Sequence, residues 1–220
     1  MSPPTLKQRL IQLGEWFFRQ RSWTPIVFML GLVLLRYRES RDVFAWVPGL
    51  CFIALGEGLR LWGVAVVGKG SRTRGGGVAR LVTDGPYAYV RNPLYLGNLL
   101  LTVGVTCISK LLWAVPIVAA LYLIQYVPIV LWEESVLAER FGADYVAYCR
   151  RVPRWLPRWR RSARGGSPIS YQWRASFWSE RSTFGTIAVL LVLMIAKANL
   201  PHVPKYLQKH LRSHTFKAQS

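Results

Sequence analysis

The sequence predicts an all-α integral membrane protein, and two features of its composition lead to that class. Hydrophobic residues make up 52% of the 220 residues and lie in long runs, while 29 Lys and Arg against 10 Asp and Glu give a net charge of +19. The basic residues fall between the apolar runs, as they do in chains whose loops border a bilayer. A nucleic-acid-binding protein is also basic but carries its charge on a soluble face, so no nucleic-acid partner is expected.

The apolar runs predict about five transmembrane helices together with amphipathic helices at the membrane interface. Residues 1–22 place leucines and Phe17 at helical spacing among basic residues, which predicts an interfacial amphipathic helix. Residues 23–67 contain the first two predicted transmembrane helices. In the second of these, Glu57 and Arg60 share one helix face and can pair, either as a purely structural ion pair or as part of a site.

Residues 68–160 form the predicted core of the protein. A polar connector over 68–92 precedes the apolar stretch Leu94–Leu131, whose single charge is Lys110. That pattern predicts a tight helical hairpin that turns near Ser109 and Lys110.

The return helix is expected to continue beyond the membrane and to break or kink at Gly142. Residues 150–164 then contain seven arginines interleaved with Trp155 and Trp159, a composition that favours contact with anionic lipid at the membrane surface. Residues 161–220 form a C-terminal extension in which Thr183–Ala196 is a further predicted span.

The distribution of basic residues predicts the orientation of the chain. With the N-terminus in the cytoplasm, the inner segments hold 19 Lys and Arg residues and the outer segments hold 9, as the positive-inside rule favours. Leu81–Asn92 and Glu133–Arg164 then lie on the same cytoplasmic side, where two halves of one site can meet. We expect a multi-pass protein, of a bacterial inner membrane, whose site faces the cytoplasm.

The stretch Leu81–Gly97 places polar chemistry where a helix enters the apolar phase. Asn92, followed by proline, is a favoured helix N-cap, and a helix N-terminus beside Arg91 suits an anionic group. Glu133 and Glu134 supply a carboxylate for an ammonium, but successive helical positions are about 100° apart, so one of them is expected to face the ligand. A zwitterion attached to an aromatic base, such as an amino-acid-like nucleotide cofactor, has a matching shape.

Five motifs of the chain keep a characteristic order and spacing across residues 55–157. They are Leu81–Tyr87, Arg91–Gly97, Glu133–Glu134, Phe141–Tyr145 and Arg151–Pro153. Together they resemble the integral-membrane methyltransferases, the group of isoprenylcysteine carboxyl methyltransferases and phospholipid N-methyltransferases, and several independent motifs are more specific than one.

The resemblance implies a helical membrane fold that binds S-adenosylmethionine in a cytoplasmic pocket formed by the C-terminal half, without a Rossmann domain and without a metal. It implies methyl transfer to a carboxylate or amine of a lipophilic acceptor that arrives from the bilayer. The implied cofactor-binding residues are Leu81, Val82, Tyr87, Asn92, Pro93, Leu94, Tyr95 and Glu133, and the implied catalytic residues are Arg91, Glu134 and Arg151.

Two departures from the family pattern limit what the resemblance implies. The family has Arg-His-Pro where this chain has Asn92 between Arg91 and a proline, and an asparagine cannot titrate, so no proton shuttle is expected there. The prenylcysteine branch also carries a basic residue shortly before its glutamates, where this chain has Ile129–Trp132. A prenylcysteine acceptor therefore has little support.

Two other classes of function stay open at this stage. A sterol-reductase-like membrane enzyme with a nicotinamide cofactor shares a similar C-terminal ending, but such enzymes carry Pro-Asn-Tyr where this chain has Pro93-Leu94-Tyr95. A non-catalytic membrane adaptor could instead be anchored by the arginine- and tryptophan-rich segment.

Overall fold

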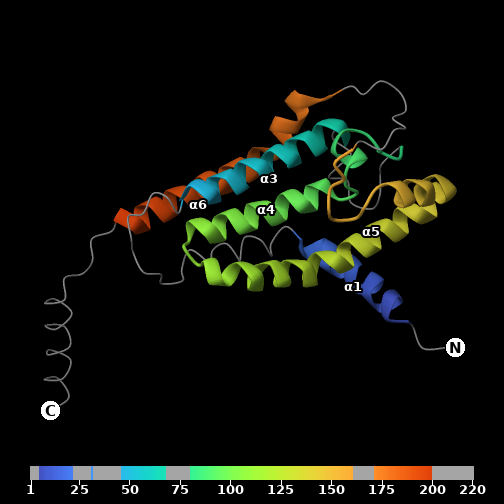
Figure 1. The fold of residues 1–220 in the computed structure, drawn as a ribbon, viewed down its shortest axis with the longest axis horizontal. Helices are drawn as coiled ribbons and strands as arrows, with labels where there is room; N and C mark the ends of the chain where they lie inside the picture. The colour runs from blue at the N-terminus through green and yellow to red at the C-terminus, as the bar shows by residue number, and fades with distance from the viewer. Residues whose placement is uncertain (1–4, 22–30, 32–45, 68–79, 161–170, 200–220) are drawn as a thin grey trace, which may run out of the picture.

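The computed structural model describes residues 5–21, 31, 46–67, 80–160 and 171–199, and all regular structure in these ranges is helical. The long helices are α1 (Leu6–Gln20), α3 (Trp46–Val67), α4 (Pro93–Ile108), α5 (Val115–Arg151) and α6 (Trp173–Asn199), and two 3-10 turns are η3 (Gly85–Ala88) and η4 (Leu112–Ala114). Figure 1 shows α4 between α3 and the first part of α5, with α6 along α3 and α1 crossing α5.

Three helical segments of the described ranges are long and apolar enough to cross a membrane: Trp46–Val67, Leu112–Arg151 and Trp173–Ala196. α4 is also apolar but shorter, at 16 residues. The predicted all-α membrane fold is therefore confirmed. The first of the two spans predicted within residues 23–67 lies outside the described residues, apart from Gly31, so the count of about five stays a prediction.

α3 and α4 are antiparallel and approach so closely that only glycine fits at two points of contact. A Cβ atom added to Gly56 would lie 2.7 Å from the Gly97 carbonyl oxygen, and one added to Gly104 would lie 2.7 Å from the Gly49 carbonyl oxygen. On each helix the two glycines are about two turns apart and therefore lie on the same face. Small residues of this kind allow helices in a membrane to pack backbone against backbone.

α4 and α5 form the predicted hairpin, and its turn lies where the sequence places it. α4 ends at Ile108, the Ser109 amide donates to the Val105 carbonyl over 2.9 Å, and Lys110 adopts a left-handed φ of 58°. Buried apolar residues of α3, α4 and α5 close the core at this end of the bundle together with Leu190 and Met194 of α6.

α6 confirms the predicted C-terminal apolar helix and begins earlier than expected. Its start is bonded to α3, because the Gln172 amide donates to the Ala65 carbonyl over 2.9 Å and the Ser176 hydroxyl donates to the Leu61 carbonyl over 2.7 Å. The C-terminal helix is thus packed along the length of α3 (Figure 1).

α1 is the helix predicted at the N-terminus, and it lies across α5. A capping box starts it, with the Thr5 side chain accepting from the Gln8 amide and the Gln8 side chain accepting from the Thr5 amide. Gly14 lies directly against the Pro128 carbonyl of α5, where a Cβ atom would approach to 2.1 Å. Its position at a membrane interface stays a prediction.

α5 is interrupted at Gly142, as the sequence predicts. Gly142 has φ 49° and ψ −122°, a backbone conformation that side chains rarely tolerate. Beyond the break the helix turns back (Figure 1), and Tyr145, Tyr148 and Val152 pack together against Leu81. The break therefore returns the chain after α5 to the segment that leads into α4.

Gly56→Ala is expected to lower the melting temperature of the purified protein in detergent. The new methyl group would meet the Gly97 carbonyl, and overpacking of this kind costs about 1–3 kcal/mol. Gly58→Ala is the matched control on the same helix, because its Cβ would meet nothing within 4 Å. Equal melting temperatures for the two variants would contradict the close approach of α3 and α4.

Candidate functional site

The candidate site forms where the chain passes from η3 into α4. Gly85 opens η3 with φ +58°, and a Cβ atom there would lie 2.6 Å from a methyl group of Val66, so the turn sits directly on the end of α3. The rings of Trp62 and Tyr89 are 6.1 Å apart between centroids. The end of α3 thus holds the segment before α4 in place.

A second segment, which follows α5, is hydrogen-bonded to the same stretch of chain. The Arg91 amide donates to the Pro153 carbonyl over 2.9 Å, and the Arg158 amide donates to the Tyr89 carbonyl over 3.1 Å. Asn92 adds a third bond, because its Nδ2 donates to the Arg154 carbonyl over 3.2 Å.

Asn92 occupies the predicted N-cap position of α4, but its side chain makes no capping hydrogen bond. The expectation of a side-chain cap is therefore wrong. The amide is turned instead towards the Arg154 carbonyl, so Asn92 ties the segment after α5 to the start of α4.

Glu134 binds two arginines, one from the segment before α4 and one from the segment after α5. Arg91 Nη1 donates to Oε1 over 2.9 Å, while Arg154 donates from Nε to Oε1 over 2.9 Å and from Nη2 to Oε2 over 2.6 Å. The Glu134 and Arg91 side chains are only 13% and 14% exposed. The hydrogen bond to Glu134 raises the pKa of Arg154, which keeps this fork charged.

Glu133 takes a different direction from its neighbour and binds a different pair of residues. The Tyr95 hydroxyl donates to Glu133 Oε1 over 2.9 Å, and Arg21 Nη1 lies 3.7 Å from the same oxygen. The two glutamates therefore divide the site into two polar groups, as their helical spacing predicts.

The remaining residues implied as cofactor-binding are half-buried or buried, and several of them contact α3 or the end of α5. Burial raises the pKa of Tyr87 far above its usual value, and the Tyr87 carbonyl accepts from the Tyr148 hydroxyl over 2.9 Å. Leu94 faces Gly63 of α3, where a Cβ atom would approach its Cδ2 to 2.9 Å. Leu81, Val82 and Pro93 are half-buried or buried in the same region, and Leu81 packs against the Tyr145 and Tyr148 cluster.

Arg151 has no hydrogen bond or ion pair with either polar group among the described residues. Its Nε donates to the Ala147 carbonyl over 3.1 Å, one turn back along its own helix, and the Arg151 carbonyl accepts from Arg158. Arg154 supplies the second guanidinium that binds Glu134. The sequence had placed Arg154 among the arginines expected to contact anionic lipid. Arg21 and Tyr148 were also missed, because their contacts arise only when distant segments pack together.

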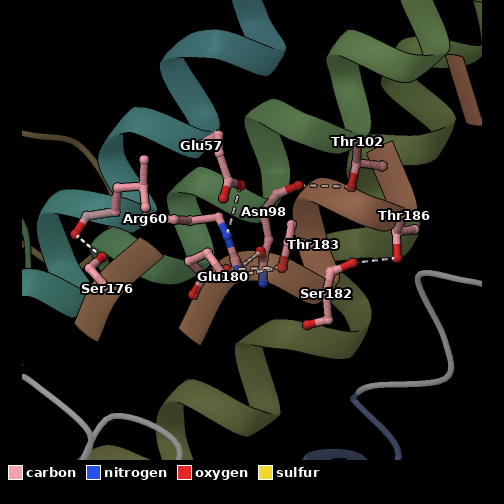
Figure 2. Close-up of polar contacts among 10 residues, drawn as sticks. Glu57, Arg60, Asn98, Thr102, Ser176, Glu180, Ser182, Thr183 and Thr186 are labelled. Atoms are coloured by element: carbon pink, nitrogen blue, oxygen red, sulfur yellow. Dashed lines mark hydrogen bonds and ion pairs between the residues drawn. The ribbon is translucent and has the colours of Figure 1, made fainter. Parts of the chain in front are cut away.

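A further polar group lies between α3, α4 and α6 (Figure 2). The predicted pair is confirmed, with Arg60 Nε 3.4 Å from Glu57 Oε2. Arg60 also donates through Nη2 to Glu180 and through Nη1 to Asn98, and it lies 3.3 Å from the Thr183 hydroxyl. Glu180 and Asn98 were not predicted, because neither is close to Arg60 in the sequence.

These features define a helical membrane protein whose polar site lies at the N-terminal end of an apolar helix. Residues 44–144 match the family model described as phospholipid methyltransferase. The chain is therefore related through this region to the integral-membrane methyltransferases, which confirms the resemblance predicted from its motifs.

Three curated relatives match this chain, and one of them is named as a methyltransferase. The protein-S-isoprenylcysteine O-methyltransferase B of Arabidopsis thaliana is 34% identical over 123 residues, or 51% of this chain and 60% of that protein. The cobalt-zinc-cadmium resistance protein CzcN of Cupriavidus metallidurans is 29% identical over 143 residues, or 62% of each chain. The nickel-cobalt-cadmium resistance protein NccN of Alcaligenes xylosoxydans xylosoxydans is 27% identical over 142 residues, or 62% of this chain and 63% of that protein.

This chain thus matches about three fifths of the length of these relatives. No solved structure shows a significant match to it.

Glu134→Gln is expected to destabilise the protein, because it leaves the largely buried Arg91 without its counter-charge. Removal of one partner from a buried ion pair costs about 3–5 kcal/mol, and the partial exposure of Arg154 places this site near the lower end. Glu139→Gln, an exposed change on the same helix, is the control. The measurement is thermal unfolding in detergent, and equal melting temperatures for the two variants would contradict the role given to Glu134.

Proposed function

We propose that this protein is an S-adenosylmethionine-dependent methyltransferase embedded in the membrane, with its site facing the cytoplasm of a bacterial cell. The observation that carries the proposal is the pairing of Tyr95 with Glu133 beside the Arg91–Glu134 ion pair, all inside the region matched by the family model. The match to a methyltransferase family favours this function over a nicotinamide-dependent reductase or a non-catalytic adaptor.

The donor set of the site fits the amino-acid end of this cofactor. Arg91 Nε is buried and has no hydrogen-bond partner among the described residues, so it can donate to a carboxylate. Glu133 accepts one hydrogen bond from Tyr95 and can accept more, because a carboxylate has about four lone-pair positions. The site thus offers one group for an anion and one for an ammonium.

When bound, S-adenosylmethionine would supply a methyl group on an electrophilic sulfonium. Glu133, oriented by the Tyr95 hydroxyl, would bind the cofactor's ammonium, and Arg91 would bind its carboxylate while Glu134 and Arg154 hold the guanidinium in place. Tyr87, Leu94 and the other apolar residues would exclude water from the reacting atoms. The contribution of the protein is then positioning and desolvation.

The acceptor would be a lipophilic molecule that enters from the bilayer and carries a carboxylate or an amine. An open apolar depression of about 190 Å³ lies beside the site and suits a hydrocarbon chain; its lining residues are Leu59, Trp62, Pro86, Tyr89, Val90 and Pro157. Tyr89 and Val90 directly precede Arg91, so a chain lying there would bring its polar head towards the ion pair.

The segment after α5 would hold this end of the protein at an anionic membrane surface. Leu156 and Trp159 are 81% and 101% exposed, and Arg158 and Arg160 lie beside Trp159 in the chain. Exposed aromatic and basic side chains together are typical of the lipid headgroup region.

Calorimetric titration with S-adenosylmethionine tests the proposed function in the purified protein. We expect saturable binding, weakened about tenfold to a hundredfold by Glu133→Gln, because the lost contact is a charge-assisted hydrogen bond of about 1.5–3 kcal/mol. Glu139→Gln should keep wild-type affinity. Absence of binding to the folded wild-type protein, or binding of NADPH in its place, would overturn the proposal.

Leu59→Trp is expected to weaken binding of the acceptor without changing binding of the cofactor, because the larger ring would fill the apolar depression. The assay incubates the protein with labelled methyl donor and extracted membrane lipid, and base treatment of the product separates a methyl ester from a methylated amine. The acceptor KM should rise while cofactor affinity is unchanged. Leu55→Trp, at a 63% exposed position one turn earlier, is the control, and equal acceptor KM values for the two variants would exclude this depression as the docking site.

A further inference from the structure

Helix α6 lies beyond residues 44–144, which match the methyltransferase family model, yet one of its side chains binds a residue inside that region. Glu180 is 1% exposed and accepts from Arg60 of α3. A carboxylate buried within an apolar helix is expensive unless it is paired, and such residues are usually retained for function.

Arg60 is the centre of the group and joins three helices. Figure 2 shows its guanidinium between Glu57 of its own helix, Asn98 of α4 and Glu180 of α6. Because the guanidinium is planar and has its donors in fixed directions, the bond to Glu180 also sets the direction of the bond to Asn98.

Asn98 continues the connection towards the candidate site. It lies three positions after Tyr95, so both side chains project from the same face of α4. The Asn98 side chain also interacts with the Tyr126 side chain of α5, whose ring centroid is 5.1 Å from that of Tyr95.

Tyr95 is fixed on two further sides. The Tyr122 hydroxyl donates to the Tyr95 carbonyl over 2.6 Å, and the rings of Tyr122 and Tyr126 stack at 4.0 Å. Tyr95 then donates to Glu133. A continuous series of contacts therefore runs from Glu180 to the carboxylate of the candidate site.

We propose that Glu180 is a positioning residue for the Tyr95–Glu133 pair, acting through Arg60 and Asn98. What that pair binds rests on the proposed function, but the positioning itself does not. Helix α6 then helps to orient residues of the candidate site, although it lies outside residues 44–144, which match the family model.

A double-mutant cycle on ligand-free protein tests the positioning alone. Glu180→Gln, Tyr95→Phe and the double variant are compared by melting temperature in detergent. We expect the shift of the double variant to differ from the sum of the single shifts, because connected residues are not additive. Additive shifts would overturn the proposal, whether or not the protein binds a methyl donor.

A second measurement separates positioning from stability. Glu180→Gln should weaken S-adenosylmethionine binding by about threefold to thirtyfold at equal folded fraction. Ser176→Ala, which removes another hydrogen bond between α6 and α3, should lower the melting temperature and leave the affinity unchanged. If affinity follows melting temperature across both variants, Glu180 has a structural role only and the proposal is wrong.

A triple variant, Glu57→Gln, Arg60→Gln and Glu180→Gln, covers the case in which an unpaired buried charge prevents folding, because Arg60 is the counter-charge of Glu57 as well as of Glu180. Removal of all three charges is tolerated far better than removal of one, so this variant should fold but bind the cofactor as weakly as Glu180→Gln. Wild-type affinity would overturn the proposal. If the wild-type protein itself fails to bind S-adenosylmethionine, that result counts against the proposed function. The double-mutant cycle on ligand-free protein would still decide whether Glu180 positions the Tyr95–Glu133 pair.

Discussion

The contact between α3 and α4 at their paired glycines is the constraint on which the other features depend. It brings the two backbones together at Gly56 and Gly97, and so places the start of α4 beside the end of α3. That placement holds η3 against Val66 and sets Asn98 across from Arg60. Lipid offers little driving force for helix association, so close backbone packing is what can determine this arrangement.

Two neighbouring glutamates then organise the polar end of the molecule. Glu134 joins the start of α4 to the segment after α5 through Arg91 and Arg154, whereas Glu133 faces Tyr95. In the first group the Glu134 carboxylate is held by both arginines while Arg91 Nε keeps a free donor among the described residues, and in the second Glu133 can accept further hydrogen bonds. A largely buried ion pair that supports a less saturated carboxylate is an arrangement suited to orienting a bound cation.

The region that matches the family model is shorter than the part of the chain that packs around the candidate site. The match ends at residue 144, but Pro153, Arg154 and Arg158 bond to the segment 89–92 that leads into α4, and Glu180 bonds to Arg60. Segments beyond the match therefore shape the surroundings of the residues within it.

The sequence alone determined the helical membrane class and the hairpin turn at Ser109 and Lys110, because both follow from where the apolar runs begin and end. It also determined the break at Gly142, from the backbone preference of glycine, and the different directions of Glu133 and Glu134, from the helical period. Tertiary structure alone decided that Arg154 binds Glu134, that Asn92 bonds to a carbonyl and does not cap its helix, and that Glu180 pairs with Arg60. Those partners are far apart along the chain, and periodicity carries no information about which helix faces which. Close packing of the helices selected them.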